Sequence, residues 1–245
     1  PKCNSAAIKF FGAGTQRVET EAKRYFPTAR IQRLDSDSVS TRGSMEDILD
    51  RFGRGEIDIL VGTQMVAKGL DFPNVTLVGI LAADSLLRVP DFRASERNFS
   101  LLAQVSGRAG RGDTPGNVIL QTYSPEHHSI RFALTEDYRG FFAEESRMRR
   151  EALFPPFTEL ASFIVSGTDQ QRTLETARNL RELFAARPEV DVHQLFGPAP
   201  ASLEKINDRY RFQLMLKMAD LTKLTMVTRE VTRQLKKPGD TRLSI

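Results

Sequence analysis

The chain has 245 residues, of which 40% are hydrophobic, so it can bury one large core or two ordinary ones. Its net charge of +4 tolerates a polyanionic partner without requiring one. No apolar run approaches the roughly 20 residues of a membrane helix, which argues against membrane binding. A single cysteine excludes an internal disulfide framework and favours the cytoplasm.

The first half of the chain alternates strand-like with helix-like segments. Runs of branched apolar residues predict strands at 6–11, 31–34, 57–61, 75–81 and 117–122. Helical spacing predicts helices that begin near Thr15, at Ser44 and at Arg93. The buried face of the first helix would contain Val18, Ala22, Tyr25 and Phe26. Strands separated by helices favour an α/β domain with a parallel sheet.

The second half begins with a charged, helix-prone stretch at 138–153 that stops at Pro155-Pro156, which indicates a connecting helix. The segments expected after it are strand 160–166, helix 170–186, strand 192–196 with a turn at 197–200, strand 210–216, helix 221–235 and strand 242–245. This β-α-β-β-α-β order is ferredoxin-like. We therefore expect one domain at 1–136, a linker at 137–156 and a smaller α+β domain at 157–245.

Two polar loops in the first half carry the strongest functional signal. One, at 62–72, follows an apolar strand, and the carboxyl ends of such strands are where open α/β sheets bind ligands. The other, at 104–111, places Arg108 and Arg111 among small residues that let the backbone approach a ligand. Two permanently charged guanidinium groups suit a polyphosphate and the charge that develops during phosphoryl transfer.

The sequences of these two loops together resemble motifs V and VI of superfamily 2 helicases. The segments 90–97 and 118–122, the Ser124–His127 stretch, the Pro155-Pro156 break and the turn at 197–200 narrow the resemblance to the PriA family of primosomal helicases. The resemblance covers nearly the whole chain. It implies that residues 1–136 form the second RecA-like helicase lobe and that residues 157–245 form the carboxy-terminal domain of the family.

The resemblance also implies roles for individual residues. The motif VI residues would be Gln104, Arg108 and Arg111, and the two arginines would face the γ-phosphate of ATP held by the other lobe. Gly69 and Asp71 would lie near the nucleotide. The residues expected to hold the DNA backbone are Gly14, Thr15, Thr63, Gln64 and Lys68.

Arg209 and Arg211 are a further DNA-binding candidate, because they alternate with Tyr210 and Phe212 along a strand. The aromatic side chains share one face, which we expect to be core, so the arginines alone would reach DNA. Arg147, Arg149 and Arg150 either touch phosphate or form a solvated helix face.

Three smaller features have structural interpretations. His127 and His128 lack partners at metal-ligand spacing, so we expect a structural loop pair. Asp35 and Asp37 follow a strand and are expected to build a turn. Cys3 resembles the last residue of a truncated zinc-binding cysteine pair, and one thiolate cannot hold zinc, so no metal is expected on this chain.

The resemblance implies part of an ATP-dependent 3′-to-5′ DNA helicase of the replication restart primosome, which uses ATP and Mg²⁺ and carries zinc when complete. The sequence contains neither a phosphate-binding Gly-Lys-Ser/Thr loop nor an Asp-Glu-x-His box, and it begins with Pro1. We therefore expect a monomeric fragment that is inactive alone, with no bound cofactor.

The partners expected for the complete protein are forked DNA with a single-strand/duplex junction, the single-stranded-DNA-binding protein and other primosome proteins. One alternative is a binding module with a silent motor, and a weaker one is another superfamily 2 helicase that acts on RNA or branched DNA.

Overall fold

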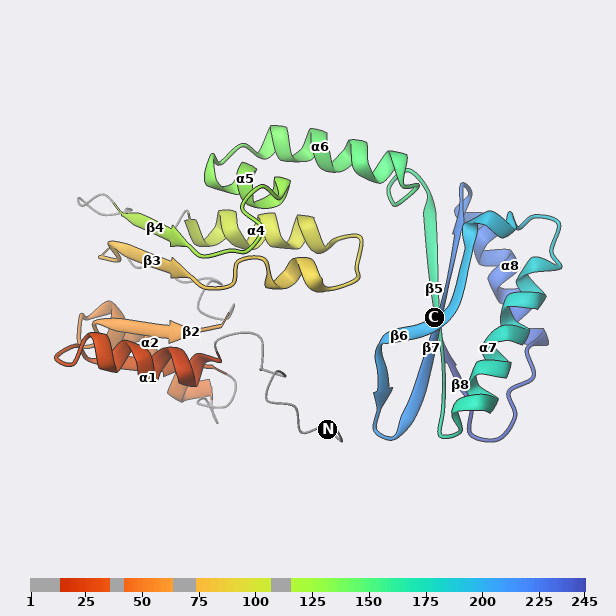
Figure 1. The fold of residues 1–245 in the computed structure, drawn as a ribbon, viewed down its shortest axis with the longest axis horizontal. Coiled ribbons are helices and arrows are strands. Elements are labelled where there is room, and N and C mark those ends of the chain that lie inside the picture. The colour runs from red at the N-terminus through yellow and green to blue at the C-terminus, as the bar shows by residue number, and fades with distance from the viewer. Residues whose placement is uncertain (1–13, 36–41, 64–73, 107–115) are drawn as a thin grey trace. The chain divides into compact units, whose positions relative to one another are not determined.

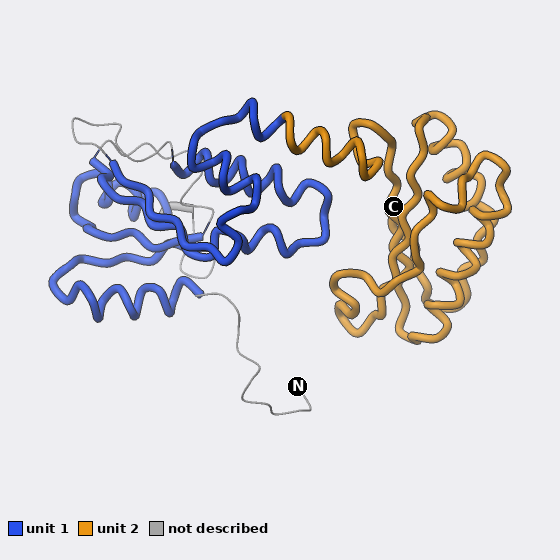
Figure 2. The backbone as a smooth tube through the Cα atoms, turned by 45° about the horizontal axis from the view of Figure 1, so that its top comes forward, with its two compact units in different colours: residues 1–142 blue, residues 143–245 orange. Residues whose placement is uncertain are grey.

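The structure is a computed structural model, which describes residues 14–35, 42–63, 74–106 and 116–245 (Figure 1). The chain divides into two compact units, residues 1–142 and residues 143–245 (Figure 2). The division falls inside helix α6 (Tyr138–Glu151), within the linker predicted at 137–156. The predicted strand at 6–11 lies outside the described residues.

The described residues of unit 1 form two pairs of parallel strands. Strand β1 (Ile31–Leu34) pairs with β2 (Ile59–Gly62), and β3 (Leu77–Ile80) pairs with β4 (Asn117–Leu120). The other elements described in this unit are α1 (Thr15–Tyr25), α2 (Arg42–Gly53), the 3-10 helix η1 (Ser85–Arg88), α4 (Ala94–Ser106), α5 (His128–Leu134) and the start of α6. The parallel pairing and the alternation of strands with helices confirm the predicted α/β class.

The apolar faces of these helices form two small cores. Leu34, Ile48 and Ile57 bury α2 against the first strand pair. The second core joins α4, α5 and α6 to the second pair, and its buried members are Ala83, Phe99, Leu102, Ile130, Ala133 and Phe141. Helix α4 therefore packs on α5 within the second core (Figure 1).

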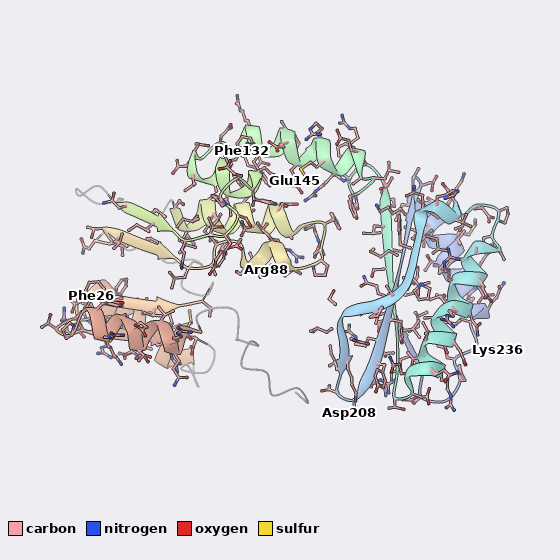
Figure 3. All side chains as sticks on the ribbon, in the orientation of Figure 1. Phe26, Arg88, Phe132, Glu145, Asp208 and Lys236 are labelled. Atoms are coloured by element: carbon pink, nitrogen blue, oxygen red, sulfur yellow. The ribbon has the colours of Figure 1, made fainter. Side chains whose placement is uncertain are left out.

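Three local predictions for unit 1 were wrong. Helix α2 begins at Arg42, so Ser44 is inside the helix rather than at its start. Tyr25 and Phe26 are 71% and 56% exposed, because they lie where α1 ends and the chain turns towards β1, past the stripe formed by Val18 and Ala22. Figure 3 shows Phe26 at the edge of this unit. Helix α5 forms where a loop was expected.

Unit 2 has the ferredoxin-like order that the sequence predicted. Its elements are β5 (Glu159–Gly167), α7 (Gln170–Ala185), the 3-10 helix η2 (Val192–Gln194), β6 (Leu195–Ile206), β7 (Arg209–Met218), α8 (Leu221–Gln234) and β8 (Arg242–Ser244). The strands lie in the order β6-β7-β5-β8, and each neighbouring pair is antiparallel. Helices α7 and α8 cover the same face of this sheet (Figure 1).

Strict alternation along β7 builds the core of unit 2. Phe212, Leu214 and Leu216 are buried against the two helices, whereas the side chains between them point to the other face. The carboxylates of Asp169 and Asp220 accept hydrogen bonds from backbone N–H groups in the first turns of α7 and α8, which satisfies groups that have no helical partner.

The strand predicted at 192–196 is shifted. Residues Val192–Gln194 form the 3-10 helix, and β6 runs on through the segment 197–200 that was expected to be a turn. Gly197 has a φ of +91°, and a Cβ there would lie 2.5 Å from the Gln213 carbonyl oxygen. Glycine is therefore needed where β6 bulges against β7, and the segment interrupts the ladder instead of ending the strand.

Candidate nucleotide and DNA site

Helix α4 carries Gln104, the first predicted catalytic residue. Its inward stripe is formed by Ala94, Asn98, Phe99 and Leu102, whereas Gln104 is exposed near its carboxyl end. Arg108 and Arg111 lie outside the described residues, which end after Ser106 at this point. A helix with one buried and one exposed face thus presents Gln104 to the surface, and the segment with both arginines follows this helix in the sequence.

The amino-terminal end of α4 is fixed by Asp91. Its carboxylate accepts hydrogen bonds from the backbone N–H of Arg93 at 2.9 Å and from Arg93 Nη2 at 3.1 Å, and Arg97 Nη1 lies 3.0 Å away. The side-chain hydrogen bond from Arg93 is the main cause of the lowered pKa of Asp91. A carboxylate at the start of a helix also interacts favourably with the helix dipole.

Strand β2 ends at Gly62, and Thr63 follows it as an exposed residue. The carboxyl end of this parallel strand is the edge at which the sequence placed a ligand site. The remaining predicted contacts in this loop, Gln64, Lys68, Gly69 and Asp71, lie outside the described residues. Cys3 lies outside them as well.

Gly14 and Thr15 begin α1, as predicted, but Thr15 is already bonded within the protein. Its hydroxyl donates to Asp35 Oδ2 at 2.5 Å, and Arg33 Nε lies 3.4 Å from the same oxygen. Asp35 is buried at 6% exposure. It therefore ties the end of β1 to the start of α1, a role that the turn interpretation missed because the contact spans 20 residues.

Asp84 is a buried carboxylate that sequence reasoning did not single out. It is 3% exposed and accepts hydrogen bonds from the Tyr123 backbone N–H and the Thr122 hydroxyl, both at 3.3 Å. Burial alone would raise the pKa of Asp84, but the hydrogen bonds from Tyr123, from its own backbone and from Thr122 lower it. The carboxylate links the chain after β3 to the chain after β4, at the carboxyl ends of neighbouring parallel strands.

The two histidines hold α5 in place. His127 is the N-cap residue of α5, and its Nδ1 accepts from the Ser129 backbone N–H at 3.3 Å. His128 is buried, and its ring stacks on Phe141 at a centroid distance of 5.6 Å. Both contacts are structural, as expected, although they belong to a helix and not to a loop.

Arg209 and Arg211 differ in how far the protein engages them. Arg209 donates to Asp240 Oδ2 at 2.8 Å and to the Ser166 carbonyl at 3.1 Å, and its side chain is 19% exposed. Arg211 makes one hydrogen bond of 3.2 Å to the Leu203 carbonyl. The Arg209 guanidinium is thus engaged in hydrogen bonds within the protein, so Arg211 is the better candidate for a phosphate contact. DNA binding stays a prediction for both arginines.

The basic cluster on α6 is also engaged by the protein. Arg147 pairs with Glu151 and Arg149 with Glu145, each at 2.8 Å, and the Arg150 guanidinium lies 4.6 Å from the centre of the Phe157 ring. These contacts favour the helix-face interpretation over phosphate binding. Among the described residues, no group of three or more His, Cys, Asp or Glu could hold a metal ion. Within that same part of the chain, no helix is long and apolar enough to cross a membrane.

Comparison with known proteins assigns families to both units. Residues 7–113 match the family described as helicase conserved C-terminal domain, and residues 150–245 match the family described as primosomal protein N C-terminal domain. Relatives named replication restart protein PriA are 46% identical over 97% of this chain in Bacillus subtilis and 44% identical over 92% in Synechocystis. A third, from Treponema pallidum, is 36% identical over 98% of the chain.

The chain spans only part of these relatives. It covers 29% of the Bacillus subtilis protein, 27% of the Synechocystis protein and 36% of the Treponema pallidum protein. The helicase match includes both predicted motif loops, 62–72 and 104–111, and the second match includes every strand of the four-stranded sheet.

Proposed function

The chain belongs to the PriA family of replication restart proteins, and from this premise we propose that it supplies the second RecA-like lobe and the carboxy-terminal domain of an ATP-dependent DNA helicase. The observation that carries the proposal is the exposed Gln104 on a helix fixed at its start by Asp91. A helix held in a fixed position suits a catalytic site formed between two lobes. The stabilisation that a polar or charged group gives to the transition state falls steeply when the group is displaced.

In this proposal the nucleotide lies between this lobe and another one. Arg108 and Arg111 stabilise the charge on the transferring phosphoryl group, and Gln104 orients the attacking water or the γ-phosphate. Gly69 and Asp71 contact the nucleotide from the loop after β2. ATP, Mg²⁺ and zinc belong to the complete protein, and the isolated chain has no ATPase activity because it lacks a phosphate-binding loop.

The DNA backbone is held along the same lobe. Thr63, Gln64 and Lys68 contact phosphates from the loop after β2, and Gly14 and Thr15 do so from the start of α1, where backbone N–H groups favour an anion. In unit 2, Arg211 adds a phosphate contact and Arg209 a weaker one. We further propose 3′-to-5′ translocation by a cytoplasmic monomer on forked DNA, with the single-stranded-DNA-binding protein and other primosome proteins as partners.

The test is DNA-stimulated ATPase activity of the full-length protein that carries this chain. Arg108→Ala should lower kcat by about 10³-fold, the range for the loss of an arginine finger. Arg139→Ala is the matched control, since Arg139 is an exposed arginine on α6, remote in sequence from both motif loops. Undiminished activity of Arg108→Ala would show that this arginine is not a catalytic finger, whereas a wild-type protein with no DNA-stimulated ATPase activity would support the alternative of a binding module whose motor is silent.

A further inference from the structure

A buried amide lies in the interface between α4 and α5. Asn98 is 0% exposed and belongs to the inward stripe of α4, whose other members, Ala94, Phe99 and Leu102, are all apolar. Its partner in the interface is Ser129, which is also 0% exposed. Polar side chains at such positions need an explanation, because burying an amide costs free energy unless its hydrogen bonds are made.

The two side chains belong to a directional series of hydrogen bonds. Asn98 Nδ2 donates to Ser129 Oγ at 3.1 Å, and Ser129 Oγ lies 2.9 Å from His127 Nδ1. His127 Nδ1 accepts from the Ser129 backbone N–H, so this nitrogen carries no proton and the Ser129 hydroxyl donates to it. The series therefore runs from α4 to the N-cap of α5: Asn98 donates to Ser129, and Ser129 donates to His127.

The series leaves part of the amide unsatisfied. Asn98 Oδ1 is buried without a hydrogen-bond partner among the described residues. An apolar side chain of similar size would avoid that penalty, as replacement of buried polar groups often does. The amide thus contributes something other than stability, and the best-attested use of a lone polar residue in an apolar helix interface is to specify register.

The aromatic contacts near the amide join α4 and α5 to α6 rather than to each other. Phe99 stacks on Phe141 at a centroid distance of 4.2 Å with an interplanar angle of 4°, and Phe141 also stacks on His128. A hydrogen bond between α4 and α5 weakens steeply once its distance or angle changes. The bond from Asn98 to Ser129 therefore opposes sliding and rotation of α4 on α5.

Register of α4 matters because of what the helix carries. Gln104 lies six residues after Asn98, which is about 9 Å along the helix axis and roughly 240° around it. Any rotation of the inward stripe would displace Gln104, and the arginine segment follows only two residues after α4 ends. A group inside the interface can thus set the position of groups on an exposed face of the same helix.

We propose that Asn98, Ser129 and His127 are positioning residues that set the register of α4 on α5 and thereby place Gln104. The proposal rests on the proposed ATPase function of this lobe. The three residues have no proposed contact with nucleotide or DNA, and they act through α4.

The test uses the full-length protein with Asn98→Leu, Ser129→Ala and the double variant. DNA-stimulated ATPase activity should fall on the order of tenfold in kcat, with KM for ATP nearly unchanged, because the affected groups act in the transition state. The unfolding temperature of Asn98→Leu should be equal to or above that of the wild type. The double variant should be no slower than the slower single variant, since both changes break the same bond.

The controls separate the possible failures. Ser100→Ala, an exposed position on the same helix, should retain wild-type kcat. Wild-type kcat in both single variants beside an inactive Arg108→Ala would overturn this proposal alone, whereas an active Arg108→Ala would overturn the proposed function and this inference with it. A kcat loss that follows a lower unfolding temperature and recovers on cooling would assign a merely structural role and also overturn the proposal.

Discussion

Arg209 Nη1 lies 2.8 Å from Asp240 Oδ2, the same oxygen that accepts a hydrogen bond from the Thr168 backbone N–H at 3.1 Å. Nη2 of Arg209 also donates to the carbonyl oxygens of Ser166 and Asp240. The first residue of β7 therefore joins the end of β5 to the loop before β8. These bonds hold the short edge strand β8, which has only three residues, against the sheet.

Arg209→Ala should destabilise the chain. The change removes several charge-assisted hydrogen bonds and leaves Asp240 without its cation, so we expect the free energy of unfolding to fall by about 1–2 kcal/mol. Urea unfolding monitored by circular dichroism measures the change. A wild-type unfolding midpoint in Arg209→Ala would show that the contacts of this arginine contribute nothing to the fold.

Arg211→Ala should leave stability nearly unchanged and weaken DNA binding instead. Its guanidinium makes one hydrogen bond, to a backbone carbonyl, so the unfolding free energy should change by less than about 0.5 kcal/mol. Loss of one phosphate contact should weaken single-stranded DNA binding several-fold and reduce the slope of log affinity against log salt by about 1. Fluorescence anisotropy at several salt concentrations measures both, and an unchanged slope would remove Arg211 from the DNA interface.

Asp35→Asn should strengthen DNA binding at the start of α1. The Asp35 carboxylate accepts the hydrogen bond of the Thr15 hydroxyl. It also places a negative charge beside the helix terminus that would hold a phosphate. The amide keeps an acceptor for Thr15 but removes that charge, so DNA affinity should rise about two- to fivefold at low salt. Thr15→Val should change affinity little, because its hydroxyl is already bonded. A fall in affinity for Thr15→Val would show that the hydroxyl reaches DNA.

Local patterns predicted most of the secondary structure. The alternation of Tyr210, Phe212 and Leu214 with polar residues identified β7, because strand periodicity depends on neighbours two positions apart. The same local information placed α4, α7 and α8 to within a few residues. It failed at Gly197, where the glycine serves a bulge in a continuing strand, because the need for it arises from the Gln213 backbone across the sheet.

The candidate site was less predictable, because its supporting contacts link distant parts of the sequence. Asn98 meets Ser129 across 31 residues, and Asp84 meets Thr122 across 38. Motif resemblance identified the residues that would touch ligands, such as Gln104. It carried no information about which buried polar groups hold them, since those depend on how helices and strand ends pack.

Asp58 should contribute to acid sensitivity in unit 1. Its carboxylate accepts hydrogen bonds from the Arg30 side chain and backbone, at 2.6 to 2.9 Å, and the side-chain bond is the main cause that lowers the pKa of Asp58 to about 2. Because the pKa is below its value in the unfolded chain, about 3.9, the stabilisation is complete above about pH 5 and is lost as the pH falls towards 2.

The stability gap between wild type and Asp58→Asn should therefore be constant from pH 7 to 5 and should shrink between about pH 4 and 2. Unfolding midpoints in urea at pH 6 and pH 3 measure the gap. Asp50→Asn, at an exposed position on α2, serves as the matched change. A gap that persists unchanged at pH 2.5 would contradict the assigned role of the Arg30 contact.

Lys217 should show a pH dependence of the same sign in unit 2, but in the alkaline range. Its Nζ donates to the Ala152 carbonyl oxygen at 2.7 Å and lies 3.7 Å from the centre of the Phe154 ring, and the residue is 7% exposed. Burial lowers the pKa of Lys217 below its usual 10.5. Between the lowered value and 10.5 the unfolded chain binds more protons than the folded chain, so this lysine contributes more stability as the pH rises.

Lys217→Met keeps the apolar stem against Phe154 but leaves the Ala152 carbonyl unpaired, which should cost about 1 kcal/mol at pH 7. Lys217→Ala also loses the stem and should cost about 2–3 kcal/mol. The gap between wild type and Lys217→Met should widen from pH 7 to pH 10, because only the wild type sheds the penalty of a buried charge. Urea unfolding across this range measures the gap, and a gap that narrows would mean that the charged form is the more stabilising one, through its interaction with the Phe154 ring.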